Sequence, residues 1–108
     1  MIREMYYTYM LRCEDNTVYT GITTDVRRRM NEHFTKSDRC AKYTRVHTAK
    51  KLEAVWRCEN RVLASKFEFH IKGLTKEQKE LLISENLLDI LNGKIDTQRY
   101  ERIQNVFV

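Results

Sequence analysis

The first twenty residues alternate between apolar and polar positions in a pattern that is typical of a β-hairpin. Residues 5–12 are rich in aromatic and other β-forming types, and they predict a strand. Residues 17–20 have the same character and predict the returning strand, because Glu14-Asp15-Asn16 between the two runs is a turn signal. The chain is therefore expected to open with two antiparallel strands.

The length of the turn decides which side chains share a face of this hairpin. A two-residue loop puts Tyr9 and Tyr19 on opposite faces. A three-residue loop pairs Leu11 with Tyr19, and both tyrosines then lie on one face. We predict the three-residue loop, with Asn16 in the left-handed region, because asparagine tolerates a positive φ.

A helical period first appears after residue 21. Val26, Met30 and Phe34 form an apolar stripe, which predicts a helix from about residue 25 to residue 34. Thr24 is the expected N-cap of this helix. Residues 35–51 carry few apolar groups and many charges, so we expect them to form a loop.

The second half of the chain predicts one more strand and three helices. Residues 52–58 alternate and predict a third strand, and Asn60 is suited to cap a helix over 61–72 that ends at Gly73. The expected core face of that helix consists of Leu63, Ala64, Phe67 and Ile71.

The last third of the chain is predicted to be helical. Thr75 and Gln78 have the spacing of a capping box, which predicts a helix through about Ser84. An apolar patch over 87–91 follows, and a last helix is predicted from Asp96 or Thr97 to about Gln104. Its expected inward-facing side chains are Tyr100, Ile103 and Phe107.

These elements predict one compact α+β domain with a small three-stranded antiparallel sheet flanked by helices. The core domain is expected over 1–84, with a helical extension over 85–108 packed on the same domain. No run approaches the roughly 18 apolar residues of a membrane span, and the start lacks the apolar core of a signal peptide, so we expect a cytoplasmic protein without a membrane partner. Cys13, Cys40 and Cys58 are too widely spaced for a metal knuckle, and we expect reduced, mostly buried thiols.

The positive charge of the chain is concentrated in its first half. The formal net charge is +5, and residues 1–51 hold eleven Lys/Arg against six Asp/Glu, whereas residues 52–108 hold nine of each. A basic run is consistent with a solvated face, but its position favours a polyanion partner, and Lys42-Tyr43-Thr44-Arg45 interleaves an aromatic ring with cations. A solvated loop with one anchoring tyrosine explains that segment equally well. The candidate nucleic-acid-binding residues are Arg27, Arg28, Lys42, Tyr43, Arg45 and Lys72.

Hydrolysis of a phosphodiester needs an activated water, stabilisation of charge at phosphorus and help for the leaving oxygen. The chain contains suitable groups for each task. Arg29 and His33 are four residues apart, so they share one face of the first helix, close to the expected positions of the hairpin tyrosines. Glu68 lies at the margin of the apolar face of helix 61–72, where helix geometry favours a surface role, paired with Lys72. The candidate catalytic residues are Tyr9, Tyr19, Arg29, His33 and Glu68.

The spacing of these residues resembles that of the GIY-YIG nuclease domain. The segments that carry the resemblance are Tyr7-Thr8-Tyr9, Tyr19-Thr20-Gly21, the helix residues Arg29 and His33, and Glu68. The chain is most similar to the small single-domain UPF0213 (endonuclease-like) family, which is related to the N-terminal domain of the bacterial excision-repair endonuclease. The resemblance covers about residues 5–83. It departs from the family pattern at Tyr7, where the first motif has glycine, and at Thr20, where the second has isoleucine.

The resemblance implies a divalent-metal-dependent endonuclease that acts on nucleic acid, with DNA favoured over RNA as the substrate. One of Tyr9 and Tyr19 would be the general base, Arg29 would clamp the scissile phosphate, and His33 would support the base or the phosphate. Glu68 would bind Mg²⁺ or Mn²⁺, against the surface role that helix geometry favours. Arg29 and the metal are expected to lower the pKa of the tyrosine base.

Two alternatives remain open at this point. The chain would also suit a nucleic-acid-binding module with a weak or silent site that uses the basic 27–51 face, or an interaction adaptor that uses the 85–108 tail. We expect a monomer or a weak homodimer.

Overall fold

An antiparallel sheet of four strands, in the order β2-β1-β3-β4, forms the centre of the fold. The computed structural model of the protein describes residues 4–104. The predicted α+β class and antiparallel sheet are confirmed, and the sheet gains a fourth short strand from the C-terminal tail. The strands are β1 (Tyr6–Cys13), β2 (Val18–Thr23), β3 (Ala49–Cys58) and β4 (Glu101–Arg102).

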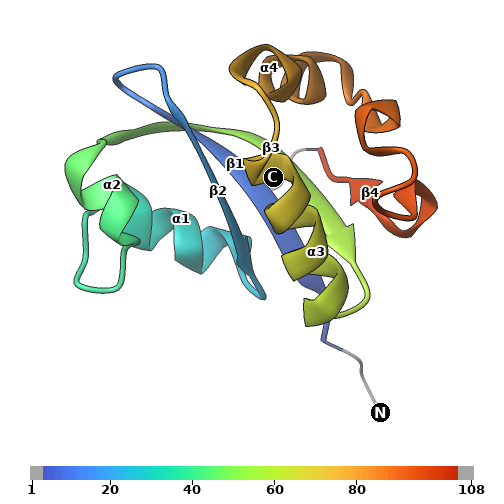
Figure 1. Cartoon of the computed structure of the whole chain (residues 1–108). Coiled ribbons are helices and arrows are strands. Elements are labelled where there is room, and N and C mark those ends of the chain that lie inside the picture. The colour runs from blue at the N-terminus through green and yellow to red at the C-terminus, as the bar shows by residue number, and fades with distance from the viewer. Residues whose placement is uncertain (1–3, 105–108) are drawn as a thin grey trace.

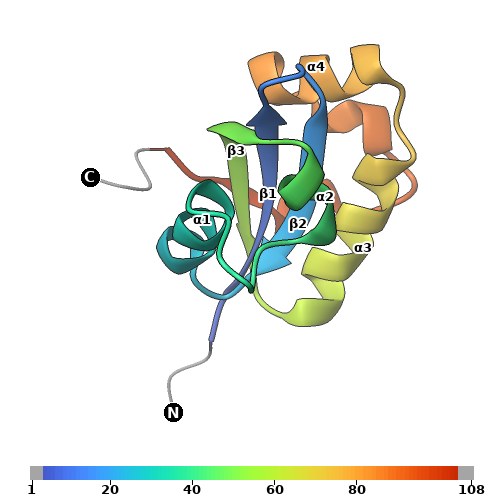
Figure 2. The same ribbon diagram turned by 90° about the vertical axis from the view of Figure 1, so that its left-hand side faces the viewer.

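Helices cover both faces of the sheet (Figure 1). On one side lie α1 (Val26–Phe34) and the short α2 (Lys42–Val46), and on the other lie α3 (Arg61–Lys72) and α4 (Lys76–Glu85). Figure 2 faces the first side, with α2 in front of the strands and α1 beside it. Within residues 4–104, no helix has the length and apolar character that crossing a membrane requires.

The hairpin has the predicted register. Leu11 pairs with Tyr19, and Asn16 has a φ of 70° in the left-handed region. The side chains of Tyr9 and Tyr19 therefore lie on the same face of the sheet, with their ring centroids 6.2 Å apart. The single positive-φ residue in the turn thus decides that both phenols face the α1 side.

Helix α1 begins one residue later than predicted. The side chain of Asp25, rather than that of Thr24, accepts the capping hydrogen bond from the Arg28 amide at 3.0 Å. The buried face of α1 consists of Val26, Met30 and His33, whereas Phe34 is 44% exposed. The predicted apolar stripe was therefore wrong at its last position, because the imidazole takes the inward place.

The predicted loop over 35–51 was wrong in its second half. Residues 42–46 form α2, and β3 begins at Ala49 rather than Leu52. A five-residue helix has no apolar stripe of its own, so its formation depends on contacts with the rest of the fold.

The caps predicted for the two helices on the other face are confirmed. The Asn60 side chain accepts from the Leu63 amide at the start of α3, and Thr75 and Gln78 make both hydrogen bonds of the capping box at the start of α4. Ala64, Phe67 and Ile71 are buried against the sheet, with Leu63 packed at the edge of that cluster.

The C-terminal tail packs as a 3-10 turn and a strand, so the helix predicted over 96–104 was wrong. Thr97–Arg99 forms the 3-10 turn, and β4 then pairs with the free edge of β3. Sheet pairing and burial override a weak helical pattern here. The predicted inward position of Tyr100 is confirmed, since it is buried and donates to Leu63 O at 2.7 Å. Phe107 lies outside the described residues.

Two part-buried groups of contacts hold α4 and the tail on the sheet. Arg12 of β1 donates to both carboxylate oxygens of Glu80 at 2.6 and 2.5 Å, and it also bonds Glu53 at 3.0 Å. Arg102 lies over the Trp56 ring, with its guanidinium carbon 5.0 Å from the ring centroid, and donates to Ile83 O at 3.1 Å. The three cysteines are buried free thiols, as predicted.

Candidate active site

Three aromatic rings form the centre of the candidate site on the α1 side of the sheet. The ring centroids of Tyr9 and His33 are 5.6 Å apart, and those of Tyr19 and His33 are 5.5 Å apart. Tyr9 and His33 are fully buried, whereas Tyr19 is half-buried. The hairpin register and the inward face of α1 thus bring together three of the five side chains that the sequence singles out.

Gly21 makes room for this cluster. It lies opposite Tyr9 in the β1–β2 ladder, and a Cβ atom at position 21 would lie 2.5 Å from the Tyr9 hydroxyl oxygen and 2.7 Å from Cζ. Ordinary contacts between such atoms are about 3.5–4.0 Å. Glycine is therefore required by the close approach of the phenol to the backbone of β2, and not by a turn.

Both ring nitrogens of His33 are hydrogen-bonded. Nε2 lies 2.6 Å from the Tyr9 hydroxyl, and Nδ1 lies 2.8 Å from the hydroxyl of Thr44 in α2. Burial, followed by the positive charge of Arg29, lowers the pKa of His33 to about 4. At neutral pH the imidazole is therefore uncharged, and it can accept a proton.

Burial raises the net pKa of Tyr9, although the hydrogen bond and charge of Arg29 lower it, as expected. Burial is the largest cause of the rise and the adjacent Tyr19 is the second, and together the raising effects outweigh the lowering effect of Arg29. Tyr9 is thus a neutral phenol at neutral pH. It can act as a base only if its own proton passes to a neighbouring group, and His33 is the group that contacts it.

Arg29 lies beside Tyr9 but is held by its own helix and the following loop. Its guanidinium donates to Glu32 at 2.8 Å and to the backbone carbonyl of Arg39, and its side chain is 20% exposed. The cation is therefore partly accessible to a ligand.

Glu68 and Lys72 reach the cluster from the opposite layer. They lie one turn apart on α3 and form an ion pair at 3.3 Å, and the Lys72 ammonium is 5.8 Å from the centroid of the Tyr19 ring. The charge of Glu68 also contributes to the raised pKa of Tyr9. Because β2 is an edge strand, side chains from the two layers can meet beyond it. Glu68 is both a surface residue, 24% exposed, and a neighbour of the tyrosines.

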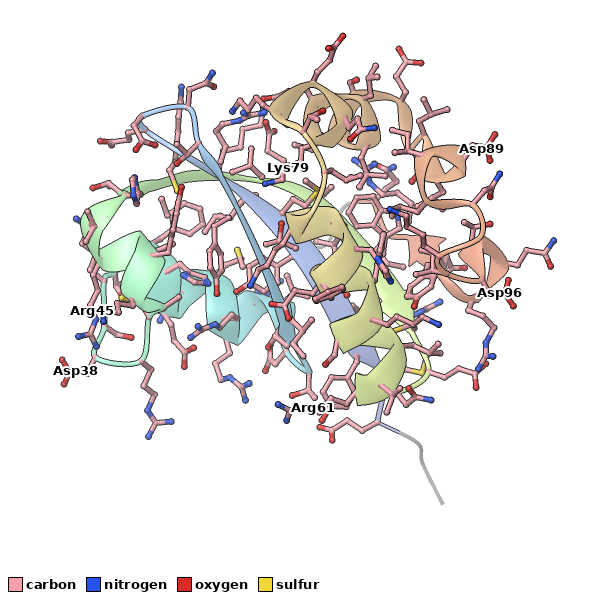
Figure 3. The ribbon with its side chains drawn as sticks, viewed as in Figure 1. Asp38, Arg45, Arg61, Lys79, Asp89 and Asp96 are labelled. Carbon is pink, nitrogen blue, oxygen red and sulfur yellow. The ribbon has the colours of Figure 1, made fainter. Side chains whose placement is uncertain are left out.

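The predicted nucleic-acid-binding residues are divided among several places. Tyr43 joins the site, because its ring stacks on Tyr19 with centroids 5.5 Å apart, and Lys72 joins it from α3. Arg45 donates to Asp38 O at 2.6 Å, and Figure 3 shows both side chains at the α2 end of the molecule, away from α3. Lys42 is exposed on α2.

Arg27 and Arg28 lie at the start of α1. Both line a pocket with Tyr7 and Arg57, next to the first turn of α1. This end of α1 is the one farther from Tyr43 in the sequence. Arg28 also lines a second pocket, with Arg29 and Arg61, so it borders the site from another direction.

Two further neighbours of the site are Thr44 and Lys79, and sequence reasoning assigned no role to either. Thr44 belongs to the segment 42–45, which interleaves an aromatic ring with cations. An isolated threonine in an expected loop gives no indication of a hydrogen bond to a buried histidine. Lys79 lines a pocket between the hairpin and α4 with Tyr43, and Figure 3 shows it beneath α4. Lysine on a charged helix is normally a solvated residue, so only the fold shows which pocket Lys79 lines.

The single carboxylate of the site suits a metal ion that keeps most of its water ligands, rather than one bound entirely by protein side chains. Within residues 4–104 no group of three or more His, Cys, Asp or Glu side chains is arranged to hold a metal ion. Glu68 offers a single carboxylate next to the tyrosines. Mg²⁺ commonly keeps several waters and binds through one or two carboxylates and the phosphates of a substrate, so this donor set fits it.

Comparison with known proteins places these features in a family. Residues 5–81 match the model of the GIY-YIG catalytic domain. The chain belongs to the GIY-YIG family. The members of this family are nucleases that act on nucleic acids and generally use divalent metal ions. The motif that carries Tyr9 and the motif that carries Tyr19 and Gly21 both lie within the matched residues, so the resemblance inferred from the sequence is confirmed.

Similar proteins from bacteria carry the name UPF0213. The UPF0213 protein of Fusobacterium nucleatum is 40% identical over 102 residues, which are 94% of this chain and 98% of that protein. The UPF0213 protein of Salmonella typhimurium is 44% identical over 80 residues, 74% of this chain and 78% of that protein. A solution NMR structure of the UPF0213 protein from Bacillus halodurans is 32% identical and covers 82% of this chain and 97% of that one, with a TM-score of 0.48.

Proposed function

We propose that this protein is a divalent-metal-dependent endonuclease that hydrolyses phosphodiester bonds in DNA. The observation that carries the proposal is the 2.6 Å hydrogen bond between the buried Tyr9 hydroxyl and the neutral imidazole of His33, next to Tyr19. A phenol that contacts a proton acceptor in a cluster flanked by a guanidinium and a carboxylate suits base-assisted attack of water on a phosphate.

In this proposal the proton of the attacking water passes to the Tyr9 oxygen while the Tyr9 proton passes to Nε2 of His33. The transfer leaves a hydroxide-like nucleophile and an imidazolium, and Tyr9 ends as a neutral phenol again. The relay removes the need for a free tyrosinate, which the raised pKa of Tyr9 disfavours. Tyr19 is half-buried beside the same atoms and would position the water.

Arg29 and Glu68 would act on the phosphate. Arg29 would stabilise negative charge on its non-bridging oxygens, since a guanidinium matches phosphate geometry. Glu68 would exchange its ion pair with Lys72 for Mg²⁺, and Lys72 would then contact the substrate backbone. The metal, when bound, supplies Lewis-acid polarisation of a phosphoryl oxygen.

Cleavage of nicked, branched and single-stranded DNA in the presence and absence of Mg²⁺ tests this proposal. We expect Mg²⁺-dependent cleavage by the wild-type protein and a loss of at least about 100-fold in rate for Glu68→Gln and Tyr9→Phe, in line with the usual size of metal and acid–base contributions. Glu85→Gln, at the exposed last residue of α4, is the matched control and should cut as the wild type does.

The competing function is a nucleic-acid-binding module with a silent site. It predicts salt-dependent binding that Glu68→Gln leaves unchanged, with no cleavage at any metal concentration. If every band that the wild-type protein produces is also produced by Glu68→Gln, the nuclease proposal is wrong and the binding module replaces it. Parallel reactions on RNA of the same sequence decide between the two nucleic acids.

A further inference from the structure

Three hydrogen bonds link the candidate site to α2, and the donor and acceptor of each can be assigned. The Thr44 hydroxyl lies 3.1 Å from Ala41 O, and a carbonyl oxygen can only accept, so Thr44 donates its proton there. Thr44 Oγ1 must then accept from Nδ1 of His33 at 2.8 Å. That choice leaves Nε2 of His33 unprotonated, facing the Tyr9 hydroxyl at 2.6 Å.

The opposite direction leaves a proton without an acceptor. If Thr44 donated to Nδ1 instead, Nε2–H would donate to the Tyr9 oxygen. The Tyr9 proton would then have no acceptor among the hydrogen bonds of residues 4–104, although Tyr9 is fully buried. Buried polar groups are rarely left in that state.

We propose that Thr44 is a positioning residue that holds His33 as the Nδ1–H tautomer, so that Nε2 is free to take the Tyr9 proton. All three side chains are fully buried, so water cannot replace the threonine. Helix α2 serves the site in a second way, because Tyr43 stacks on Tyr19 from the preceding position. The inference rests on the proposed function for its catalytic meaning but not for its structural content.

The tautomer can be measured directly by ¹⁵N NMR of the imidazole nitrogens at pH 7–8, with His33 assigned by comparison with His47→Asn and His70→Gln. We expect a protonated Nδ1 and an unprotonated Nε2 in the wild type and in Thr44→Ser, which keeps the hydroxyl. In Thr44→Val, which keeps the shape and removes the hydroxyl, we expect the Nε2–H form to appear. An Nε2–H tautomer in the wild type, or identical nitrogen shifts in Thr44→Val, would overturn the proposal.

Kinetic constants distinguish a positioning role from a merely structural one, because a structural role would not lower kcat selectively. If the protein cleaves DNA, Thr44→Val should lower kcat by about 10–100-fold with KM unchanged, because general acid–base catalysis contributes about 100-fold or more, and Thr44→Ser should restore it. Equal activity of Thr44→Val and wild type contradicts the positioning role. If no variant cleaves DNA, the proposed function fails while the NMR result still decides the tautomer.

A second observation concerns the groove at the other end of the β2 edge. Arg28 and Arg29 of α1 and Arg61 at the start of α3 line one pocket, together with residues from the end of β2. The side chains of Arg28 and Arg61 are exposed, and neither makes an ion pair within residues 4–104. Figure 3 shows Arg61 directed toward the space between α3 and α1. Glu32, which pairs with Arg29, is the acid in this pocket.

We infer that this groove binds a second phosphate of the nucleic-acid strand. That phosphate would be next to the phosphate that Arg29 contacts. Three guanidinium groups against one carboxylate make it a cationic track, and Arg29 belongs to both the groove and the site, so one strand can occupy both. This inference deepens the proposed function, but it predicts binding rather than cleavage.

Binding of a fluorescein-labelled oligonucleotide, followed by anisotropy over a range of NaCl concentrations, tests the groove. Arg61→Ala should weaken binding at low salt and reduce the slope of log K against log[salt] by about one. Lys66→Ala, which removes an exposed cation from the next turn of α3, should change neither quantity. An unchanged slope for Arg61→Ala, or equal effects of the two variants, contradicts the inference whether or not the protein cuts DNA.

Discussion

The close approach of Tyr9 to the backbone of β2 makes Gly21→Ala a sensitive test of the structure. The new Cβ would lie 2.5 Å from the phenolic oxygen and 2.7 Å from Cζ, about 1 Å inside ordinary contact distance. Tyr9 cannot easily retreat, because it is fully buried and bonded to His33. The methyl group must therefore displace either the phenol or the strand.

The expected cost follows from three contributions. Overpacking of a core costs about 1–3 kcal/mol, and loss of the Tyr9–His33 hydrogen bond costs about 1 kcal/mol. Alanine recovers about 0.5–1 kcal/mol relative to glycine in a strand. We expect the free energy of unfolding to fall by about 1–3.5 kcal/mol and Tm to fall by roughly 10 °C, which leaves the protein folded.

Urea denaturation followed by circular dichroism measures this change. Gly73→Ala is the matched control, because its Cβ would meet no atom closer than 3.6 Å and its φ is −82°, so its stability should match the wild type or rise slightly. In a Tyr9→Leu background the clash is relieved, and Gly21→Ala should cost at least about 1 kcal/mol less. A Gly21→Ala protein as stable as Gly73→Ala, or an equal cost in both backgrounds, would refute the reasoning.

Three further predictions concern charge and the tail. His33 should titrate near pH 4 by NMR, and a titration near pH 6.5 would contradict this prediction. Because the pKa in the folded protein lies below the unfolded value of about 6.5, the neutral imidazole stabilises the fold by about 3 kcal/mol. This stabilisation is complete above pH 6.5 and is lost as the pH falls toward 4. The hydrogen bond from Arg12 lowers the pKa of Glu80 to about 2, so Glu80→Gln should destabilise the protein by about 1 kcal/mol at pH 7 after allowance for solvent screening, with the difference from wild type shrinking between pH 4.5 and pH 2. Denaturation curves that differ equally at pH 2 and pH 7 would argue against that ion pair. A chain that ends at Glu85 loses Tyr100 from the core and Arg102 from Trp56, and we expect circular dichroism and size-exclusion chromatography to show an unfolded or aggregated protein; a monomer with wild-type Tm would show that the tail is dispensable.

Local signals in the sequence were sufficient for the parts of the fold that rest on short-range chemistry. The turn at Asn16 predicted the pairing of Leu11 with Tyr19, and the caps at Asn60 and Thr75 predicted where two helices begin. Each of these features depends on one side chain and its immediate neighbours in the chain. The start of α1 was off by one residue because Thr24 and Asp25 are both good caps.

The parts that sequence reasoning missed depend on distant contacts. Helix α2 has too few residues to form alone, and its Tyr43 and Thr44 are held by a tyrosine and a histidine from other elements. The β4 strand has two residues, too few for any alternation, and it forms because β3 offers a free edge.

Glu68 shows the limit most clearly. Its place on the helix favoured a surface role, and only the family resemblance favoured the site. The structure explains why the surface role and the site role conflict. Glu68 is at the surface of the α3 layer, and the edge strand β2 lets it approach the tyrosines on the α1 side of the sheet. The catalytic roles of the five residues stay predictions.

The meeting of two layers at the edge strand β2 means that the parts of the site are held by different elements. Tyr9, Tyr19 and His33 come from a hairpin and the helix that follows it, so they lie within 25 consecutive residues, 9–33. Glu68 comes from α3, which is docked on the far face. A local displacement of α3 therefore moves the carboxylate away from the site while the hairpin and α1 still hold the phenol–imidazole pair. If Glu68 holds a metal as proposed, that binding should be lost at milder denaturant than the tyrosine–histidine hydrogen bond.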